Sequence, residues 1–362
     1  MTKNAAEFVT PLTFSTLSEN IVNIDMFKEK FSGQNFEHIS LAKWADCVVV
    51  VPATANIIAK ITYGIADDLL SSTCLAIQVP LVIVPAMNMG MWNNSITQEN
   101  IKKLQKRDVE ILGPDFGVQA CGDIGEGKML EPIDVLEMLP RVFLKQILKN
   151  KRVVITAGPT IEEIDPVRII TNKSSGKMGY AIANAALNLG AETILISGKT
   201  NLKVPKGIKY IETSSSKDMY KNVKKELKNA DMFISVAAVS DFCVKNKSKQ
   251  KIKKSSKLIL ELEKNIDIIS NVKKDGFKGL VVGFAAETEK LIENARKKLK
   301  NKKMDIIIAN DISGKKVFGR CENEVTILNK KGYEKKLKLK SKEKLGYEIL
   351  EEIQNFKKNK KN

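Results

Sequence analysis

A short polar segment near the middle of the chain has the residue types that bind phosphate. Thr171-Asn172-Lys173 leads into Ser174, Ser175, Gly176 and Lys177, followed by Met178-Gly179. Glycine lets backbone approach a ligand, serine hydroxyls and the first N–H groups of a helix donate hydrogen bonds, and lysine adds a cation. The same residues also suit ordinary loop and helix-capping chemistry, so the segment alone leaves both interpretations open. Known phosphate fingerprints do not decide between them, because Gly198-Lys199-Thr200 lacks the glycine that a P-loop requires at Thr193, and Gly122, Gly125 and Gly127 have the wrong spacing for a dinucleotide fingerprint.

Two further side chains in the first half could do chemistry. Cys121 lies among glycines 117, 122, 125 and 127, which suit a mobile flap whose thiol could donate a proton to a substrate. His38 is the one histidine of the chain. It directly precedes an amphipathic helix, and spacing alone favours a structural role at the helix start over a catalytic one.

The elements that must position these residues follow an α/β pattern in both halves. We expect a doubly wound sheet in the second half, because short apolar strands alternate with amphipathic helices and ligands bind where such strands end. A predicted helix at 135–148 and polar residues 149–152 separate domains 1–149 and 150–362. In the first half we expect strands at 47–51 and 81–84, and in the second half strands at 152–156, 192–196, 208–212, 231–236, 280–284 and 305–309, with helices at about 177–189, 216–228, 287–301 and 342–355.

Composition indicates a globular cytoplasmic protein. The chain has 362 residues, of which 43% are hydrophobic, enough for two packed cores. Its longest apolar runs are too short for a membrane span, and the N-terminus has no secretion pattern. Five scattered cysteines without a Cys-x-x-Cys pair argue against disulfides and structural zinc.

The charge is divided unevenly along the chain. The net charge is +18, but residues 1–150 carry 13 basic and 17 acidic residues, which leaves +22 on residues 151–362. A basic half raises a nucleic-acid-binding alternative, which predicts salt-sensitive binding to random duplex. The lysines lack the interleaved aromatic residues that stack bases, so we favour a solvated surface and small polyanions such as nucleotides.

Five segments of the first half, in order, closely resemble the flavin-dependent phosphopantothenoylcysteine decarboxylases. They are His38-Ile39-Ser40-Leu41-Ala42-Lys43-Trp44-Ala45-Asp46, Pro52-Ala53-Thr54-Ala55-Asn56, Gly64-Ile65-Ala66-Asp67-Asp68-Leu69-Leu70, Pro85-Ala86-Met87-Asn88-Met89-Gly90-Met91-Trp92 and Ala120-Cys121-Gly122-Asp123.

This resemblance implies a set of site residues and a cofactor. FMN would oxidise the cysteine moiety of the substrate, which creates the electron sink for decarboxylation. His38 would be a base or an orienting residue, Asn88 would hold the substrate carboxylate and Cys121 would donate the final proton. Thr54, Asn56 and Met87 would contact FMN, and family members form trimers with the site between subunits.

The resemblance also suggests that the first βα unit is missing. Family members begin with a strand, a Gly-Gly-Ile-type loop and a helix, whereas Met1 matches a later position. We therefore expect weakened FMN binding, with a misplaced start codon, a truncated gene or a scaffold role as the alternatives.

The second half looks like bacterial phosphopantothenate-cysteine ligase along nearly its whole length, and fusion of the two enzymes is usual in bacteria. The segments that carry the likeness are Ile155-Thr156-Ala157-Gly158-Pro159-Thr160, Asp165-Pro166-Val167-Arg168, Thr171–Gly179, Ala237-Ala238-Val239-Ser240-Asp241-Phe242, Lys251-Ile252-Lys253-Lys254, Gly283-Phe284-Ala285-Ala286-Glu287-Thr288 and Ala309-Asn310-Asp311.

The ligase resemblance implies CTP as co-substrate, Mg²⁺ and a dimer. Asn172 would stabilise an acyl-cytidylate intermediate, and Lys251 would support its formation or its attack by the cysteine amine. Lysines and magnesium would offset the repulsion between carboxylate and triphosphate. If the resemblance is set aside, the residue types alone indicate that Phe284 is a core residue and that Lys298 and Lys302 lie on a solvated helix face. The residues implied at CTP are Ser235, Val236, Ala237, Asp241, Lys251, Ile266, Asp267, Ile268, Ile269, Phe284, Lys298 and Lys302, with a departure at Ile266, where relatives commonly have proline.

The sequence therefore predicts a bifunctional enzyme of coenzyme A biosynthesis. It would ligate 4'-phosphopantothenate to cysteine with CTP and then decarboxylate the product with FMN. Its partners would be these small molecules and further copies of itself, with no nucleic acid and no membrane. The alternatives are a ligase whose first half only aids oligomerisation, and a flavoprotein regulator without turnover.

Overall fold

The computed structural model describes residues 1–26, 36–254, 258–287, 289–311 and 322–358. They form two compact units, Met1–Phe143 and Leu144–Asn362. Within the described residues, no helix has the length and apolar character needed to cross a membrane.

Unit 1 is built on a parallel three-stranded sheet in the order β1-β2-β3. These strands are β1 (Val48–Ala53), β2 (Leu81–Pro85) and β3 (Glu110–Ile111), which confirms the two predicted strands. β1 is an edge strand among the described residues, and the side chain of Val51 is 47% exposed. An antiparallel hairpin of β4 (Asp115–Val118) and β5 (Ile124–Lys128) carries Cys121 in its turn region.

The helices of unit 1 follow the apolar pattern of the sequence, with one exception. The predicted helix at 135–148 is wrong, because the α-helix ends at Met138 and a 3-10 turn covers Leu139–Val142. Pro140 has no N–H and its ring would clash with the carbonyl of residue 136, so an α-helix cannot continue there. The helices are α1 (Lys3–Ala6), α2 (Pro11–Ser18), α3 (Glu37–Trp44), α4 (Ala55–Tyr63), α5 (Leu69–Ala76), α6 (Met89–Asn93), α7 (Ser95–Lys106) and α8 (Pro132–Met138).

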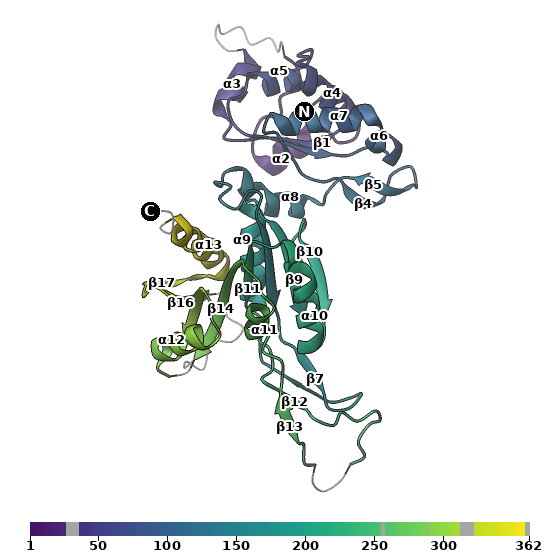
Figure 1. Cartoon of the computed structure of the whole chain (residues 1–362). Coiled ribbons are helices and arrows are strands. Elements are labelled where there is room, and N and C mark those ends of the chain that lie inside the picture. The colour runs from purple at the N-terminus through teal and green to yellow at the C-terminus, as the bar shows by residue number, and fades with distance from the viewer. Residues whose placement is uncertain (27–35, 255–257, 288, 312–321, 359–362) are drawn as a thin grey trace. The chain divides into compact units, whose positions relative to one another are not determined.

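Unit 2 contains an eight-stranded sheet in the order β10-β9-β6-β11-β14-β15-β16-β17 (Figure 1). The first six strands are parallel and confirm all six predicted strands, whereas β16 and β17 form an unpredicted antiparallel hairpin at the edge. The chain order reverses between β6 and β11, which is the switch point where doubly wound sheets hold ligands. The strands are β6 (Arg152–Ala157), β9 (Glu192–Gly198), β10 (Lys209–Thr213), β11 (Met232–Ser235), β14 (Leu280–Glu287), β15 (Ile306–Asp311), β16 (Glu322–Asn329) and β17 (Glu334–Ser341).

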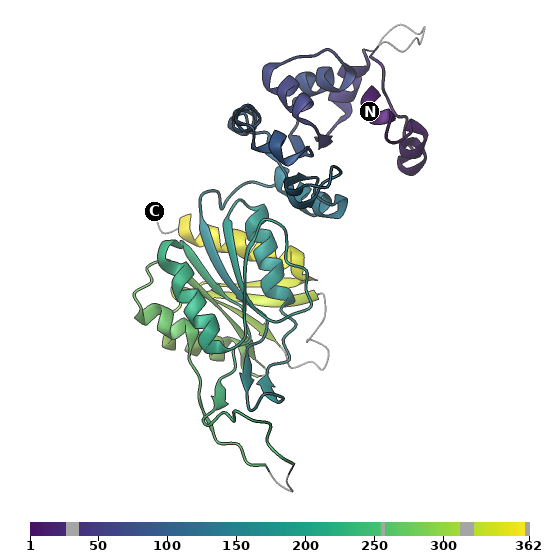
Figure 2. The same cartoon turned by 90° about the vertical axis from the view of Figure 1, so that its right-hand side faces the viewer.

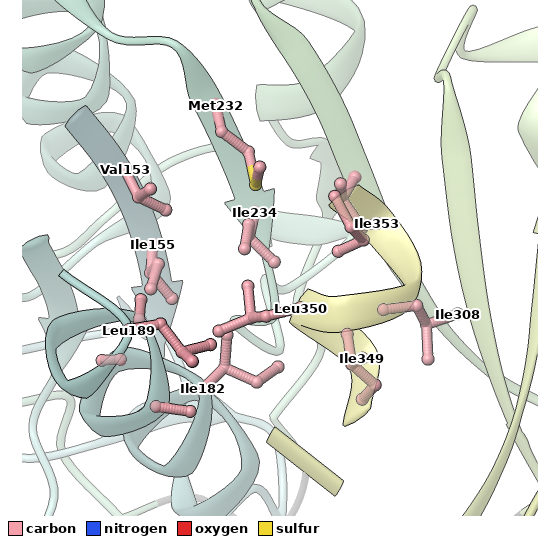
Figure 3. Close-up of a cluster of buried hydrophobic side chains, with 14 of the residues drawn as sticks. Val153, Ile155, Ile182, Leu189, Met232, Ile234, Ile308, Ile349, Leu350 and Ile353 are labelled. Atoms are coloured by element: carbon pink, nitrogen blue, oxygen red, sulfur yellow. The ribbon is translucent and has the colours of Figure 1, made fainter. Parts of the chain in front are cut away.

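Helices cover both faces of this sheet. On what we call the first face, α9 (Lys177–Asn188) and α13 (Lys342–Lys358) bury Ile182 and Leu350 against Ile155 and Ile234 (Figure 3). On the second face, α10 (Ser216–Glu226), α11 (Ile268–Lys274) and α12 (Leu291–Asn301) pack on Val154, Phe233 and Ile307. The helix predicted from 287 begins at Leu291, because β14 continues to Glu287.

Two small ribbons extend beyond the carboxyl end of the sheet (Figures 1 and 2). They pair β7 (Ile161–Glu163) with β8 (Ile169–Thr171), and β12 (Phe242–Val244) with β13 (Leu262–Lys264). The buried Asp165 accepts the Ile252 N–H at 3.1 Å, and the Arg168 guanidinium donates to the Ile252 carbonyl at 3.2 Å. These bonds fix the backbone beside Lys251.

Candidate functional site

A cavity of about 490 Å³ lies at the carboxyl edge of the unit 2 sheet. The ends of β11 and β14, the loop before α9 and the start of α11 all contribute to its wall. Every residue that the sequence implies at CTP lines it, apart from Lys251, and so do Asn172 and the residues of the predicted phosphate loop: Ser174, Ser175, Gly176 and Lys177. Residues up to about 130 positions apart along the chain therefore meet where Brändén's rule places a ligand.

Two glycines, one at the N-cap of α9 and one in its first turn, hold the start of the helix close to the sheet. A Cβ on Gly176, whose φ is +77°, would lie 2.9 Å from Thr200 Cγ2, and a Cβ on Gly179 would lie 2.5 Å from Ala157 Cβ. Asn172 Nδ2 donates to the Ala238 carbonyl at 3.0 Å, which ties the loop to the segment after β11. The first turn of α9 thus opens directly into the cavity, as a phosphate site requires.

The two lysines predicted to hold a triphosphate each pair with a carboxylate in this structure. Lys298 Nζ lies 2.6 Å from Glu287 Oε1, and Lys302 Nζ lies 3.1 Å from Asp267 Oδ2. Burial alone raises the pKa of Asp267, but hydrogen bonds from Ser270 and the charge of Lys302 outweigh it, so its pKa lies below the usual value. The two carboxylates hold the lysines at the cavity.

Lys251 does not line the cavity. It is exposed and lies between β12 and β13, next to Ile252, which is bonded to Asp165 and Arg168. Its catalytic role stays a prediction.

A second cluster joins two predicted residues in unit 1. Asn88 Oδ1 caps α6 by accepting the Gly90 N–H at 2.7 Å, and its Nδ2 lies 3.3 Å from Cys121 Sγ. Asp123 Oδ2 accepts from Asn88 Nδ2 at 2.8 Å and from the Cys121 thiol at 3.4 Å. The amide and the thiol thus face a common space.

Gln119 attaches the β4–β5 hairpin to the start of α6. Its Oε1 accepts the Met89 N–H at 2.9 Å, and its Nε2 donates to the Glu126 carbonyl at 3.1 Å. The Met87 N–H also donates to the Gly127 carbonyl at 3.0 Å. These bonds bring Cys121 to Asn88.

The three residues predicted at FMN lie at the carboxyl ends of neighbouring strands. Thr54 caps α4 after β1 by accepting the Ile57 N–H, Asn56 follows in the first turn and Met87 follows β2. The Ala86 N–H bonds the Ala53 carbonyl at 3.0 Å, so the two strand ends adjoin. Exposed hydroxyl and amide groups beside the thioether suit the polar edge and the apolar ring of a flavin.

His38 lies in the first turn of α3. Its Nδ1 atom is buried without a hydrogen-bond partner in the part of the chain that is described, and its ring lies 6.0 Å from that of Phe36. Among the described residues, no hydrogen bond joins His38 to Asn88 or Cys121, so its role as a base stays a prediction.

Sequence reasoning did not assign roles to several residues that the structure places at these sites. Gln119 and Asp123 touch the Asn88–Cys121 pair, and the quoted segment Ala120–Asp123 already contained one of them. Asn265, Asn310, Asn323 and Lys342 line the cavity of unit 2. Of these, Asn310 lies within a segment quoted for the ligase resemblance. Asn323 and Lys342 are brought to the cavity by the pairing of β15, β16 and β17, which no local sequence pattern predicts.

Comparisons with known proteins match both halves of the chain to known families. Residues 1–144 match the family model described as Flavoprotein, and residues 148–356 match the DNA/pantothenate metabolism flavoprotein C-terminal domain. The chain is 46% identical to the coenzyme A biosynthesis bifunctional protein CoaBC of Haemophilus influenzae, and 43% identical to that of Bacillus subtilis. Each alignment covers 98% of this chain and 88% of the relative.

Two solved structures resemble unit 2. A crystal structure of the C-terminal domain of a CoaBC protein is 40% identical, with a TM-score of 0.52, and covers 59% of this chain and 100% of that one. The DNA/pantothenate metabolism flavoprotein from Streptococcus pneumoniae is 27% identical, with a TM-score of 0.50, and covers 57% of this chain and 99% of that one. With two matching domain models and these full-length relatives, the chain belongs to the family of coenzyme A biosynthesis bifunctional proteins.

Proposed function

We propose that the chain catalyses two consecutive steps of coenzyme A biosynthesis. Unit 2 joins 4'-phosphopantothenate to cysteine with CTP through an acyl-cytidylate, and unit 1 decarboxylates the product to 4'-phosphopantetheine with FMN. The observation that carries the ligase is the convergence of the loop 172–179, the end of β11 and the α12 lysines on one cavity. Family membership supports both activities.

In the ligase step, cations must bring two anions together. The substrate carboxylate attacks the α-phosphate of CTP and pyrophosphate leaves, after which the cysteine amine attacks the acyl carbon and CMP leaves. Lys298 and Lys302 exchange their carboxylate partners for phosphate oxygens, which offsets the repulsion. Asn172, fixed by its bond to Ala238, holds the acyl-cytidylate.

Asp241 is the carboxylate placed to bind the Mg²⁺ that accompanies the triphosphate. It lines the cavity and is exposed, and no ion pair engages it among the described residues, whereas Asp267 is occupied by Lys302 and Ser270. Mg²⁺ commonly binds through one or two carboxylates and substrate phosphates while keeping several waters.

In unit 1, FMN supplies the oxidation of the substrate thiol that makes carbon dioxide loss possible. Thr54, Asn56 and Met87 hold the flavin, and His38 acts as a base or orients the substrate. Asn88 presents Nδ2 to the substrate carboxylate, which replaces Asp123 as its acceptor. The Cys121 thiol lies beside that amide and donates the last proton.

The assembly is a homo-oligomer in the cytoplasm, with ligase dimers and decarboxylase trimers. Large apolar side chains of unit 1 support this proposal, since Trp44 at the end of α3 is 77% exposed and Phe36, which precedes the helix, is 73% exposed. Exposed apolar groups of this size commonly mark a protein interface.

A ligase-only protein is the second candidate, and the outer edge of β1, which no strand of the described residues pairs with, favours it. The deciding experiment measures pyrophosphate release from purified protein with 4'-phosphopantothenate, cysteine and either CTP or ATP, and then FMN released on denaturation. CTP-dependent release with bound FMN supports both activities, and release from a colourless protein supports the ligase alone. No release with either nucleotide contradicts the proposal.

A further inference from the structure

The group that Asn88 contacts in unit 1 is itself a carboxylate. Asn88 Nδ2 donates to Asp123 Oδ2 at 2.8 Å, while Asn88 Oδ1 accepts the Gly90 N–H at 2.7 Å. Asp123 therefore occupies the position at the amide where the carboxylate of the substrate would bind. A second carboxylate can bind there only beside the first, and two negative charges at such a short distance repel each other.

Hydrogen bonds fix the backbone of the turn that carries Asp123. The Gln119 N–H donates to the Asp123 carbonyl at 2.9 Å, and the Gly122 N–H donates to the Gln119 carbonyl at 2.9 Å. The side chain of Gln119 accepts the Met89 N–H at 2.9 Å, which ties the turn to the residue that follows Asn88. A substrate that takes over Asn88 Nδ2 therefore displaces the Asp123 carboxylate by rotation of its side chain, with the backbone in place.

After this rotation the charge of Asp123 stays close to the substrate. The same carboxylate oxygen accepts the Cys121 thiol at 3.4 Å, and Cys121 Sγ lies 3.3 Å from Asn88 Nδ2. In the described part of the chain, no lysine or arginine pairs with Asp123. The side chain is exposed, and a bound substrate that excludes water from it strengthens the repulsion between the two carboxylates.

We propose that Asp123 raises the free energy of the bound substrate through this repulsion and so speeds its decarboxylation. The bond between the carboxylate carbon and its neighbour breaks, its electron pair stays in the electron sink of the oxidised substrate, and carbon dioxide leaves without charge. The repulsion is therefore relieved as the transition state forms, which lowers the barrier. The inference rests on the proposed decarboxylase function and deepens it.

Steady-state carbon dioxide release from the FMN-loaded protein tests this role. Asp123→Asn keeps an acceptor for Asn88 and for the thiol but removes the charge, so we expect the KM for 4'-phosphopantothenoylcysteine to fall about fivefold and kcat to fall about tenfold. A fall in both constants indicates lost strain in the bound substrate, whereas loss of a purely structural contact raises KM or leaves it unchanged. Asp123→Glu keeps the charge and should restore part of kcat.

Two controls isolate the charge from other effects of the substitution. Glu126→Gln removes one charge from the same hairpin but keeps an acceptor for the Trp92 indole N–H, and it should change neither constant. The product 4'-phosphopantetheine lacks the carboxylate, so its inhibition constant should be the same for the wild type and Asp123→Asn.

Alkylation of Cys121 measures the same charge without the decarboxylase reaction. Iodoacetate carries a carboxylate and iodoacetamide does not, and each forms one C–S bond as iodide leaves, so the ratio of their rates reports the charge beside the thiol. Asp123→Asn should raise the rate with iodoacetate relative to that with iodoacetamide about fivefold, and Glu126→Gln should leave the ratio unchanged. Mass spectrometry of the peptide that contains Cys121 separates it from the other cysteines.

Asp123→Ala is the second variant, in case Asp123→Asn fails to fold as judged by its melting temperature, and the ratio should rise in it as well. The role of Asp123 is overturned if a folded variant keeps the wild-type KM and kcat, if its KM rises, or if its alkylation ratio is that of the wild type. FMN-loaded wild-type protein that releases no carbon dioxide would instead contradict the decarboxylase function itself, before any variant is compared.

Discussion

Asn88 Nδ2 lies 3.3 Å from Cys121 Sγ, although 33 positions of the chain separate the two residues. Asp123 contacts both of them through one carboxylate oxygen. The group that would hold the substrate carboxylate and the group that would donate the final proton are therefore neighbours, which is the arrangement that a decarboxylation followed by protonation needs.

Replacing Cys121 separates these two steps. Serine is a far weaker acid than cysteine, so in FMN-loaded Cys121→Ser we expect carbon dioxide release to continue while formation of 4'-phosphopantetheine falls about a hundredfold. Mass spectrometry of the products and a carbon dioxide assay measure the two outcomes together. Cys243→Ser, in unit 2, is the control and should change neither rate. Equal loss of both products would contradict the role of Cys121 as a late proton donor.

Replacing Lys298 tests the nucleotide side of the ligase cavity. Lys298→Met removes a cation held at the cavity by Glu287, so we expect the KM for CTP to rise about tenfold while the KM for 4'-phosphopantothenate stays the same. Lys297→Met is the matched control, since Lys297 lies on the same helix and pairs with the exposed Glu293 instead. Initial-rate measurements with each substrate varied give both constants, and equal effects of the two variants would refute the assignment.

Substitution of Gly179 tests the close packing of α9 on β6. A methyl group there would meet Ala157 Cβ at 2.5 Å, so Gly179→Ala should lower the free energy of unfolding of unit 2 by about 1–3 kcal/mol. It should also displace the first turn of α9 and raise the KM for CTP or the acid. Urea denaturation measures the first effect. Asn184→Ala, on the same helix, adds no atoms near β6 and should change stability by less than about 0.5 kcal/mol.

The ionised carboxylate of Asp165 stabilises unit 2, and we expect this stabilisation to be lost at acid pH. Burial alone raises the pKa of Asp165, but hydrogen bonds from the Val167, Ile252 and Arg168 N–H groups and from the Arg168 guanidinium lower it to about 2. Because this folded-state pKa lies below the unfolded value of about 3.9, the stabilisation is present above that pH and is lost as the pH falls toward 2.

Melting temperatures measured between pH 2 and pH 7 check this dependence. Asp165→Asn should melt at a lower temperature than the wild type at pH 7, and the difference should shrink as the pH falls below about 4. Asp241→Asn is the control, since no ion pair engages Asp241 among the described residues. A difference that stayed constant over the whole pH range would contradict a charge-based role for Asp165.

The sequence predicted the central strands of unit 2 well because they are buried on both faces. Such strands appear as continuous runs of β-branched residues, as in Val153–Ile155 and Ile306–Ile308. The hairpin of β16 and β17 escaped prediction because one of its strands alternates lysine with leucine at an exposed edge, where it resembles a charged tail. The helix expected at 135–148 was wrong for a local reason, Pro140.

The ligase resemblance named part of the cavity lining, whereas the residues that long-range pairing brings to the cavity were not named. Asn172, Ser235 and Phe284 meet at one cavity as the ligase resemblance implied. Asn323 and Lys342 reach the same cavity through the register of β15, β16 and β17, which pairs Asn310 with Val325 and Asn323 with Lys340. No pattern of neighbouring residues records that register.

The core that joins β6, α9 and α13 also governs how unit 2 is made on the ribosome. Val153 and Ile155 leave the exit tunnel well before Ile349, Leu350 and Ile353, which cover the same core (Figure 3). Until then the growing chain carries an uncovered apolar surface, which is the kind of surface that chaperones bind. The core of unit 2 therefore closes only after α13 has left the ribosome.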